Sequence, residues 1–181
     1  MKFFLILALV FTTCSCLRNF RIIQENVNIK VKAPDIIDEN ASVFIRKLNR
    51  TYDALNASIT VKVDLDNIYM KVDTFEKRIN KYHPFVMDMK LDFCEFMKNP
   101  AMSIFLDFFY PLLLKHSNLP RKCPIRAGNY YIHNLHMNEE DFPPSFPVDS
   151  HLRFVISLFH HGRLLYVITL GIRVEPKHFW E

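Results

Sequence analysis

The segment "KLDFCEFMKNP" places three side chains capable of chemistry close together: Asp92, Cys94 and Glu95. A thiol beside two carboxylates could act as a nucleophile, bind a metal or form half of a disulfide. The compartment in which the protein folds decides between these roles. For Asp92 and Glu95, surface acids at the end of a strand are the simpler interpretation.

Two pairs of histidines could bind a metal. His133 and His136 are three residues apart, and on a strand this spacing points the rings to opposite faces, so we expect no chelation. His160 and His161 are adjacent in a predicted hairpin turn, where two solvated rings are the simpler interpretation. We therefore expect neither a metal site nor a cofactor.

The sequence lacks the motifs of common enzyme classes. It has no G-x-S-x-G, no H-E-x-x-H, no P-loop and no dinucleotide fingerprint, and it contains only 3 Gly. The net charge of +4 is mild and scattered, so nucleic acid is not an expected partner. We expect a protein that is not an enzyme; the alternative is a hydrolase or thiol enzyme that requires a free Cys94.

The first residues indicate the compartment. Lys2 precedes an apolar run from Phe3 to Phe11, and small residues follow up to Cys16. This order is typical of a secretory signal peptide, and the run is far shorter than the ~20 apolar residues of a membrane-spanning helix. We expect a signal peptide over 1–16, one domain over 17–181, and a secreted, extracellular protein with no membrane span in its mature chain.

Secretion also bears on the cysteines. Of the 4 cysteines, Cys14 and Cys16 lie in or beside the signal, which leaves Cys94 and Cys123 in an oxidising compartment. Two thiols there most simply form one disulfide, which would stabilise the fold by roughly 3–4 kcal/mol on the chain-entropy model. A free, reactive Cys94 remains the alternative.

Three N-glycosylation motifs agree with secretion. They are "NAS" at Asn40, "NRT" at Asn49 and "NAS" at Asn56. A glycan holds its neighbourhood at the surface, so we expect these three asparagines to be exposed and glycosylated.

Alternation of apolar and polar residues predicts a mainly β protein. The alternation is clearest in "ENVNIKVK", in "ASITVKVDLD" and through Phe85–Phe93. The stretch "HLRFVISLFHHGRLLYVITLGIRVEP" predicts a hairpin with its turn at His160–Arg163. Short strands separated by turn signals favour an immunoglobulin-like antiparallel sandwich of two sheets.

One segment breaks this pattern and predicts a helical insertion between Cys94 and Cys123. In "NPAMSIFLDFFYPLLLKHSN", Asn99 suits a helix N-cap, Pro100 suits the first turn, and Pro111 should kink or end the helix. The segment is apolar nearly all round. Such a helix is either buried or faces a ligand.

Three stretches carry a resemblance to a known family. "SVFIRKLNRTYDALNASITVKVDLD", "YHPFVMDMKLDFCEFMKNP" and "HSNLPRKCPIRAGNYYI" resemble a large insect family of secreted proteins of unknown function, to which the chemosensory B proteins are related. The resemblance implies the ML lipid-recognition sandwich of the ganglioside-activator protein, which holds lipid between two antiparallel sheets. It also implies a lipid or pheromone carrier, or an accessory to a taste receptor. Val31 and Val43 stand where family members often carry two further cysteines.

We therefore expect a secreted binding protein for a hydrophobic small molecule, such as a lipid or a pheromone-like hydrocarbon, with an extracellular receptor as a further partner. The alternative is a solidly packed secreted protein that acts through its surface as a receptor ligand or accessory. Residues that line the ligand site are expected on the apolar stripes and the helix: Met87, Met89, Phe105, Phe108, Phe109, Phe154, Ile156, Tyr166 and Ile168.

Overall fold

The computed structural model describes residues 20–48, 52–99, 102–142 and 146–177, and within these ranges the side chains of Val86, Met87, Ile104, Phe105 and Phe108 are not described. The elements, in chain order, are β1 (Phe20–Val31), β2 (Ser42–Lys47), β3 (Asp53–Val61), β4 (Ile68–Arg78), β5 (Lys81–Asp92), α2 (Phe93–Lys98), α3 (Ile104–Lys115), β6 (Gly128–Leu135), η2 (Glu139–Asp141), β7 (Ser150–His160) and β8 (Arg163–Pro176). The signal peptide expected over 1–16 lies outside the described residues. Among the described residues, no helix has the length and apolar character needed to span a membrane.

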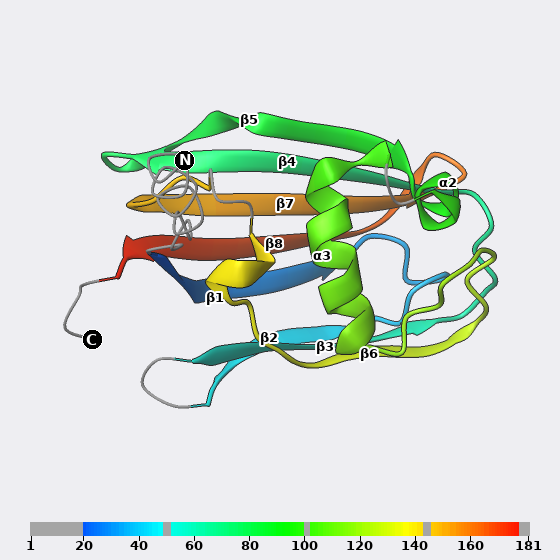
Figure 1. The fold of residues 1–181 in the computed structure, drawn as a ribbon. Helices are drawn as coiled ribbons and strands as arrows, with labels where there is room; N and C mark the ends of the chain where they lie inside the picture. Colours follow the sequence, from blue (N-terminus) through cyan, green and yellow to red (C-terminus); the bar gives the residue numbers. More distant parts are fainter. Residues whose placement is uncertain (1–19, 49–51, 100–101, 143–145, 178–181) are drawn as a thin grey trace, which may run out of the picture.

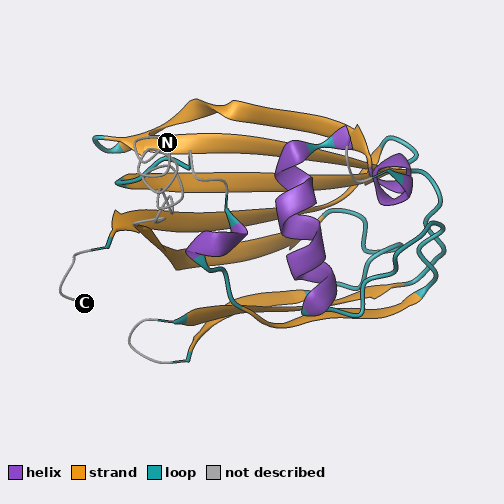
Figure 2. Cartoon of the chain, viewed as in Figure 1, coloured by secondary structure: helices purple, strands orange, loops and turns teal. Residues whose placement is uncertain are grey.

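The strands form two antiparallel sheets (Figure 1). The larger sheet has five strands in the order β1-β8-β7-β4-β5, and the smaller has three in the order β2-β3-β6. Strands dominate the described part of the chain and the helices are few (Figure 2). The predicted fold class, a mainly β sandwich of two antiparallel sheets, is confirmed.

Helix α3 bridges the two sheets. Near its beginning, Ser103 Oγ lies 3.0 Å from the sulfur of Met89 on β5. Just after its end, the His116 carbonyl accepts a hydrogen bond of 2.7 Å from the backbone N–H of His133 on β6. In Figure 1, α3 accordingly runs from the β5 edge of the larger sheet to the smaller sheet. On this helix, the side chains of Leu106 and Tyr110 are buried and form part of the hydrophobic core.

The helical insertion differs from its prediction at the first boundary. Cys94 does not end a strand but lies in α2, a short helix that the alternating pattern concealed. Asp92 caps this helix, since its Oδ1 accepts hydrogen bonds from the backbone N–H of Cys94 (2.8 Å) and of Glu95 (3.0 Å). Asn99, predicted to begin a helix, is instead the residue at which α2 ends.

The long helix also differs from its prediction. It begins after Ser103, whose hydroxyl accepts a hydrogen bond of 3.3 Å from the backbone N–H of Leu106. Pro111 was predicted to kink or end it; the helix does not end at Pro111 but continues to Lys115. The continuation is stabilised by apolar side chains beyond the proline, because Leu112 and Leu114 pack against the core.

Two strand predictions need correction. The strand predicted to run to Asp66 ends at Val61, and Leu65 beyond it forms an isolated bridge to Ile125. The edge strand β2 was not predicted, because most of its residues are exposed and the alternation is weak. The β7–β8 hairpin has its turn where it was predicted.

Candidate functional site: the inner face of the larger sheet

Apolar side chains from five strands meet on the inner face of the larger sheet. Residues that lie directly opposite each other in neighbouring strands share one face of the sheet. The ladder register aligns one such series from β1 to β5, which we call the middle row: Ile29, Ile168, Ile156, Val72 and Met89.

A further row lies on each side of the middle row. The first row consists of Val27, Leu170, Phe154 and Thr74. The second row consists of Val31, Tyr166, Leu158, Met70 and Leu91. We call the three rows together the inner apolar surface. None of its residues carries a formal charge, and its only polar side-chain atoms are the hydroxyls of Thr74 and Tyr166.

The middle row keeps accessible surface although it lies on the inner face. Val72 is 4% exposed, whereas Ile29, Ile168, Ile156 and Met89 are only half-buried. On a solidly packed inner face, the centre of the sheet would be its most protected part. The middle of this sheet therefore keeps some accessible apolar area on its inner face.

The end of the interior nearest Phe20 is filled. Ile172 and Leu152 face each other across β8 and β7, and each is 1% exposed. Aromatic rings close this end, with Phe142 and Phe146 at 4.7 Å between ring centroids. The accessible apolar surface therefore does not extend to this end of the sheet.

Polar atoms without partners lie beside this surface. Thr74 Oγ1 and Gln24 Oε1 are buried and have no hydrogen-bond partner among the residues that the structure describes. A buried polar group left unpaired costs about 1–3 kcal/mol. On the other side of the middle row, burial raises the pKa of Tyr166 to about 12, so this hydroxyl stays neutral. Neutral donors and acceptors therefore flank the apolar middle row.

The structure brings together five of the nine residues expected to line a ligand site. They share the inner apolar surface: Met89, Phe154, Ile156, Tyr166 and Ile168. Phe109 lies elsewhere, on α3, where its ring packs edge-on against Phe142 at 4.9 Å. The side chains of Met87, Phe105 and Phe108 lie outside the described part of the structure.

Sequence reasoning missed other residues of the same surface. Ile29, Val72 and Leu170 alternate within their strands just as the named residues do. The alternation could have identified them as inward-facing, but only the strand register shows that they adjoin Ile156 and Ile168.

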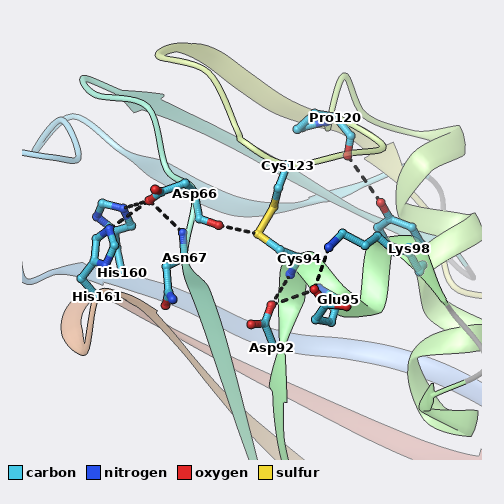
Figure 3. Close-up of a disulfide and its surroundings, with 11 residues drawn as sticks. Asp66, Asn67, Asp92, Cys94, Glu95, Lys98, Pro120, Cys123, His160 and His161 are labelled. Carbon is cyan, nitrogen blue, oxygen red and sulfur yellow. Dashed lines mark hydrogen bonds and ion pairs between the residues drawn. A yellow bond between two sulfur atoms is a disulfide. The ribbon is translucent and has the colours of Figure 1, made fainter.

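Cys94 and its neighbours have structural roles. Cys94 and Cys123 form the expected disulfide, with an S–S distance of 1.99 Å and 5.5 Å between Cα atoms (Figure 3). Glu95 forms an ion pair of 2.7 Å with Lys98, and Asp92 caps α2. Cys94 therefore offers no free thiolate for nucleophilic chemistry.

The three glycosylation motifs lie in different surroundings. Asn40 is exposed in a turn, and Asn49 lies outside the described residues. Asn56 is only 7% exposed. Its Nδ2 donates to the Ala54 carbonyl (3.3 Å) and its Oδ1 accepts from the Asn134 N–H (3.0 Å). Contrary to the expectation of exposure, the side chain of Asn56 is buried, and both of its amide atoms form hydrogen bonds.

The outer face of the smaller sheet carries a shallow depression of about 330 Å³, which we call the outer hollow. Two of the residues that line it are exposed aromatics: Phe44 is 53% exposed and Tyr131 is 51% exposed. The residues that line it are Ser42, Phe44, Asn56, Ala57, Ser58, Tyr131, Ile132 and His133. It is open to solvent and is separate from the inner apolar surface.

Comparisons with known proteins give limited matches. Residues 70–150, less than half of the chain, match a family model described as a protein of unknown function (DUF1091). No curated protein matches the chain. Among solved structures, a Niemann-Pick type C2 protein from the Japanese carpenter ant is similar at 14% identity over 86% of this chain and 91% of that chain, with a TM-score of 0.31. A likeness this distant supports no conclusion about function.

Proposed function

We propose that this protein is a secreted carrier that binds a hydrophobic small molecule, such as a lipid or a pheromone-like hydrocarbon, on its inner apolar surface. The observation that carries this proposal is the half-buried middle row on the inner face of the larger sheet. Covering that row with a ligand removes hydrocarbon from water, and each Å² buried contributes ~25 cal/mol.

The shape of the surface favours an elongated, largely apolar ligand. The middle row crosses five strands, and neighbouring strands lie about 4.8 Å apart, which gives a length of roughly 19 Å. The surface has no charged residue to pair with an ionised ligand. The hydroxyls of Thr74 and Tyr166 can instead bind one or two neutral polar atoms, such as an ester, alcohol or carbonyl oxygen.

We also propose a secreted, non-enzymatic role. A disulfide persists in oxidising compartments, so the Cys94–Cys123 bridge supports an extracellular location. The thiol enzyme considered as an alternative required a free Cys94, and the disulfide removes that nucleophile. The sequence resemblance to secreted ML proteins supports the same proposal.

The proposal is tested by filling the inner apolar surface. Ile156 and Ile168 face each other on adjacent strands, and Val155 and Thr169 form the neighbouring pair on the outer face of the same strands. The variant Ile156→Phe/Ile168→Phe should weaken binding of a fluorescent fatty-acid ester, a neutral probe, at least about tenfold, or 1.4 kcal/mol. The control Val155→Phe/Thr169→Phe should bind like the wild type.

Circular dichroism of both variants establishes that they fold before binding is compared. If wild-type protein binds neither the fatty-acid ester nor another neutral apolar probe, the carrier proposal fails. If both double variants bind as well as the wild type, a ligand is bound somewhere other than the inner apolar surface.

The outer hollow supports a second candidate function, binding of another protein. Exposed aromatic rings are enriched at protein interfaces, and Phe44 and Tyr131 lie together here. A receptor ligand or accessory that acts through this face should lose its partner in Phe44→Ala/Tyr131→Ala. The same variant should leave binding of the fatty-acid ester on the inner apolar surface unchanged.

A further inference from the structure

Two imidazoles and a carboxylate converge near the disulfide (Figure 3). His160 Nε2 lies 3.1 Å and His161 Nε2 lies 2.9 Å from the same oxygen of Asp66, its Oδ1. The two rings are 4.3 Å apart between centroids. One potential ligand atom from each of the three residues lies within 4.8 Å of the other two.

The backbone of the β7–β8 turn sets this arrangement. His161 and Gly162 both have positive φ angles, 47° and 78°, as the two central residues of a type I′ turn do. Asparagine, aspartate or glycine normally occupies the first of these positions, because other residues are strained there. Here a histidine occupies it, and its ring points toward Asp66 (Figure 3).

Asp66 is held in place from several directions. Its Oδ1 also accepts a hydrogen bond of 2.9 Å from the backbone N–H of Asn67. The Asn67 carbonyl accepts a hydrogen bond of 3.2 Å from the backbone N–H of His161, which ties the loop to the turn. The Asp66 carbonyl contacts Cys94 Sγ of the disulfide at 2.9 Å. The carboxylate is therefore positioned before any ligand arrives.

The cluster combines a fixed inner side with an open outer side. The side chain of His160 is 13% exposed, whereas those of Asp66 and His161 are 68% and 61% exposed. The expectation of two solvated histidines therefore holds for His161 and fails for His160. An ion that approaches from solvent would bind each ring through an unprotonated Nε2, with the proton of that ring on Nδ1, and would retain water on its open side.

We propose that Asp66, His160 and His161 bind a divalent transition-metal ion of the zinc and copper class. Imidazole nitrogen together with carboxylate oxygen suits these ions, whereas calcium and magnesium prefer oxygen ligands alone. Three protein ligands and one open position are a common arrangement around zinc. The bound ion would join the β7–β8 turn to the loop between β3 and β4, beside the disulfide.

The test is zinc titration of untagged, EDTA-treated protein by isothermal titration calorimetry. The wild type should bind one Zn²⁺ per chain. His161→Ala and Asp66→Asn should weaken zinc binding at least about tenfold. Tenfold is a lower bound, because loss of a residue that only supports a metal ligand already weakens metal binding by about 10–100-fold. His83→Ala is the matched control, because His83 is an exposed histidine outside the cluster, and it should bind zinc like the wild type.

Two further measurements keep the outcome decisive. His160 is largely buried, so His160→Ala puts folding at risk, and the exposed positions Asp66 and His161 decide the result. Zinc should raise the melting temperature of the wild type and of His83→Ala, and at the same zinc concentration it should raise that of His161→Ala clearly less. If the wild type binds no zinc, or if His161→Ala and Asp66→Asn bind it as tightly as the wild type, the cluster is a hydrogen-bonded group only.

Discussion

The hydroxyl of Tyr166 lies on the inner apolar surface, and burial raises its pKa from 10.0 to about 12. Between these pH values the unfolded chain loses this proton and the folded protein keeps it, so stability falls as the pH rises from 10 toward 12. Urea denaturation at several pH values should therefore show a smaller alkaline loss of stability for Tyr166→Phe than for the wild type. Equal losses would place Tyr166 in a wetter environment than the structure shows.

The structure distinguishes the two glycosylation motifs that share the sequence NAS, at Asn40 and at Asn56. Asn40 is exposed, whereas Asn56 is buried and uses both amide atoms in hydrogen bonds. Glycopeptide mass spectrometry of the secreted protein should find a glycan at Asn40 and none at Asn56. A glycan on Asn56 would contradict the register of β3 in this structure.

Substitution of Asn56 supplies an independent check. Asn56→Ala leaves the backbone N–H of Asn134 without its side-chain partner, which should cost about 1–3 kcal/mol. Asn40→Ala should lose a glycan and change the free energy of unfolding little, because its side chain is exposed.

At the scale of elements, the disulfide joins α2 to the loop before β6 across 29 residues of sequence. The double variant Cys94→Ala/Cys123→Ala should lower the free energy of unfolding by about 3–4 kcal/mol, because the unfolded chain loses a constraint. Lys98→Ala is the control on the same helix, and loss of its exposed ion pair should cost no more than about 1 kcal/mol. Equal losses of unfolding free energy in the two variants would mean that the disulfide stabilises the fold no more than an exposed ion pair does.

The elements also show how far the sequence can be interpreted. The β7–β8 hairpin was predictable because its alternation and its turn at Gly162 are local features of the sequence. Helix α2 was missed because the alternating stripe of β5 runs on to Phe93, the first residue of the helix, and the start of α2 depends on the hydrogen bonds that Asp92 makes. The middle row could not be predicted, since the register of five strands depends on contacts between distant parts of the chain.

At the scale of the whole molecule, a carrier needs an interior that is filled at one end and accessible in the middle. Ile168 and Ile172 lie on the same face of β8, but Ile168 is half-buried and Ile172 is 1% exposed. Ile172→Phe should cost about 1–3 kcal/mol through overpacking, whereas Ile168→Phe should cost well below 1 kcal/mol. Thermal and urea unfolding measure both, and equal costs would mean that the middle of the interior is as tightly packed as the end.

Native mass spectrometry of the protein secreted from insect cells, followed by solvent extraction, tests the central proposal most directly. A carrier should show a reproducible adduct with the mass of a lipid or long-chain hydrocarbon, which denaturation releases and extraction recovers. A mass that corresponds to protein and glycan alone, with no uptake from an offered panel of lipids and hydrocarbons, would contradict the carrier proposal and favour action through the outer hollow.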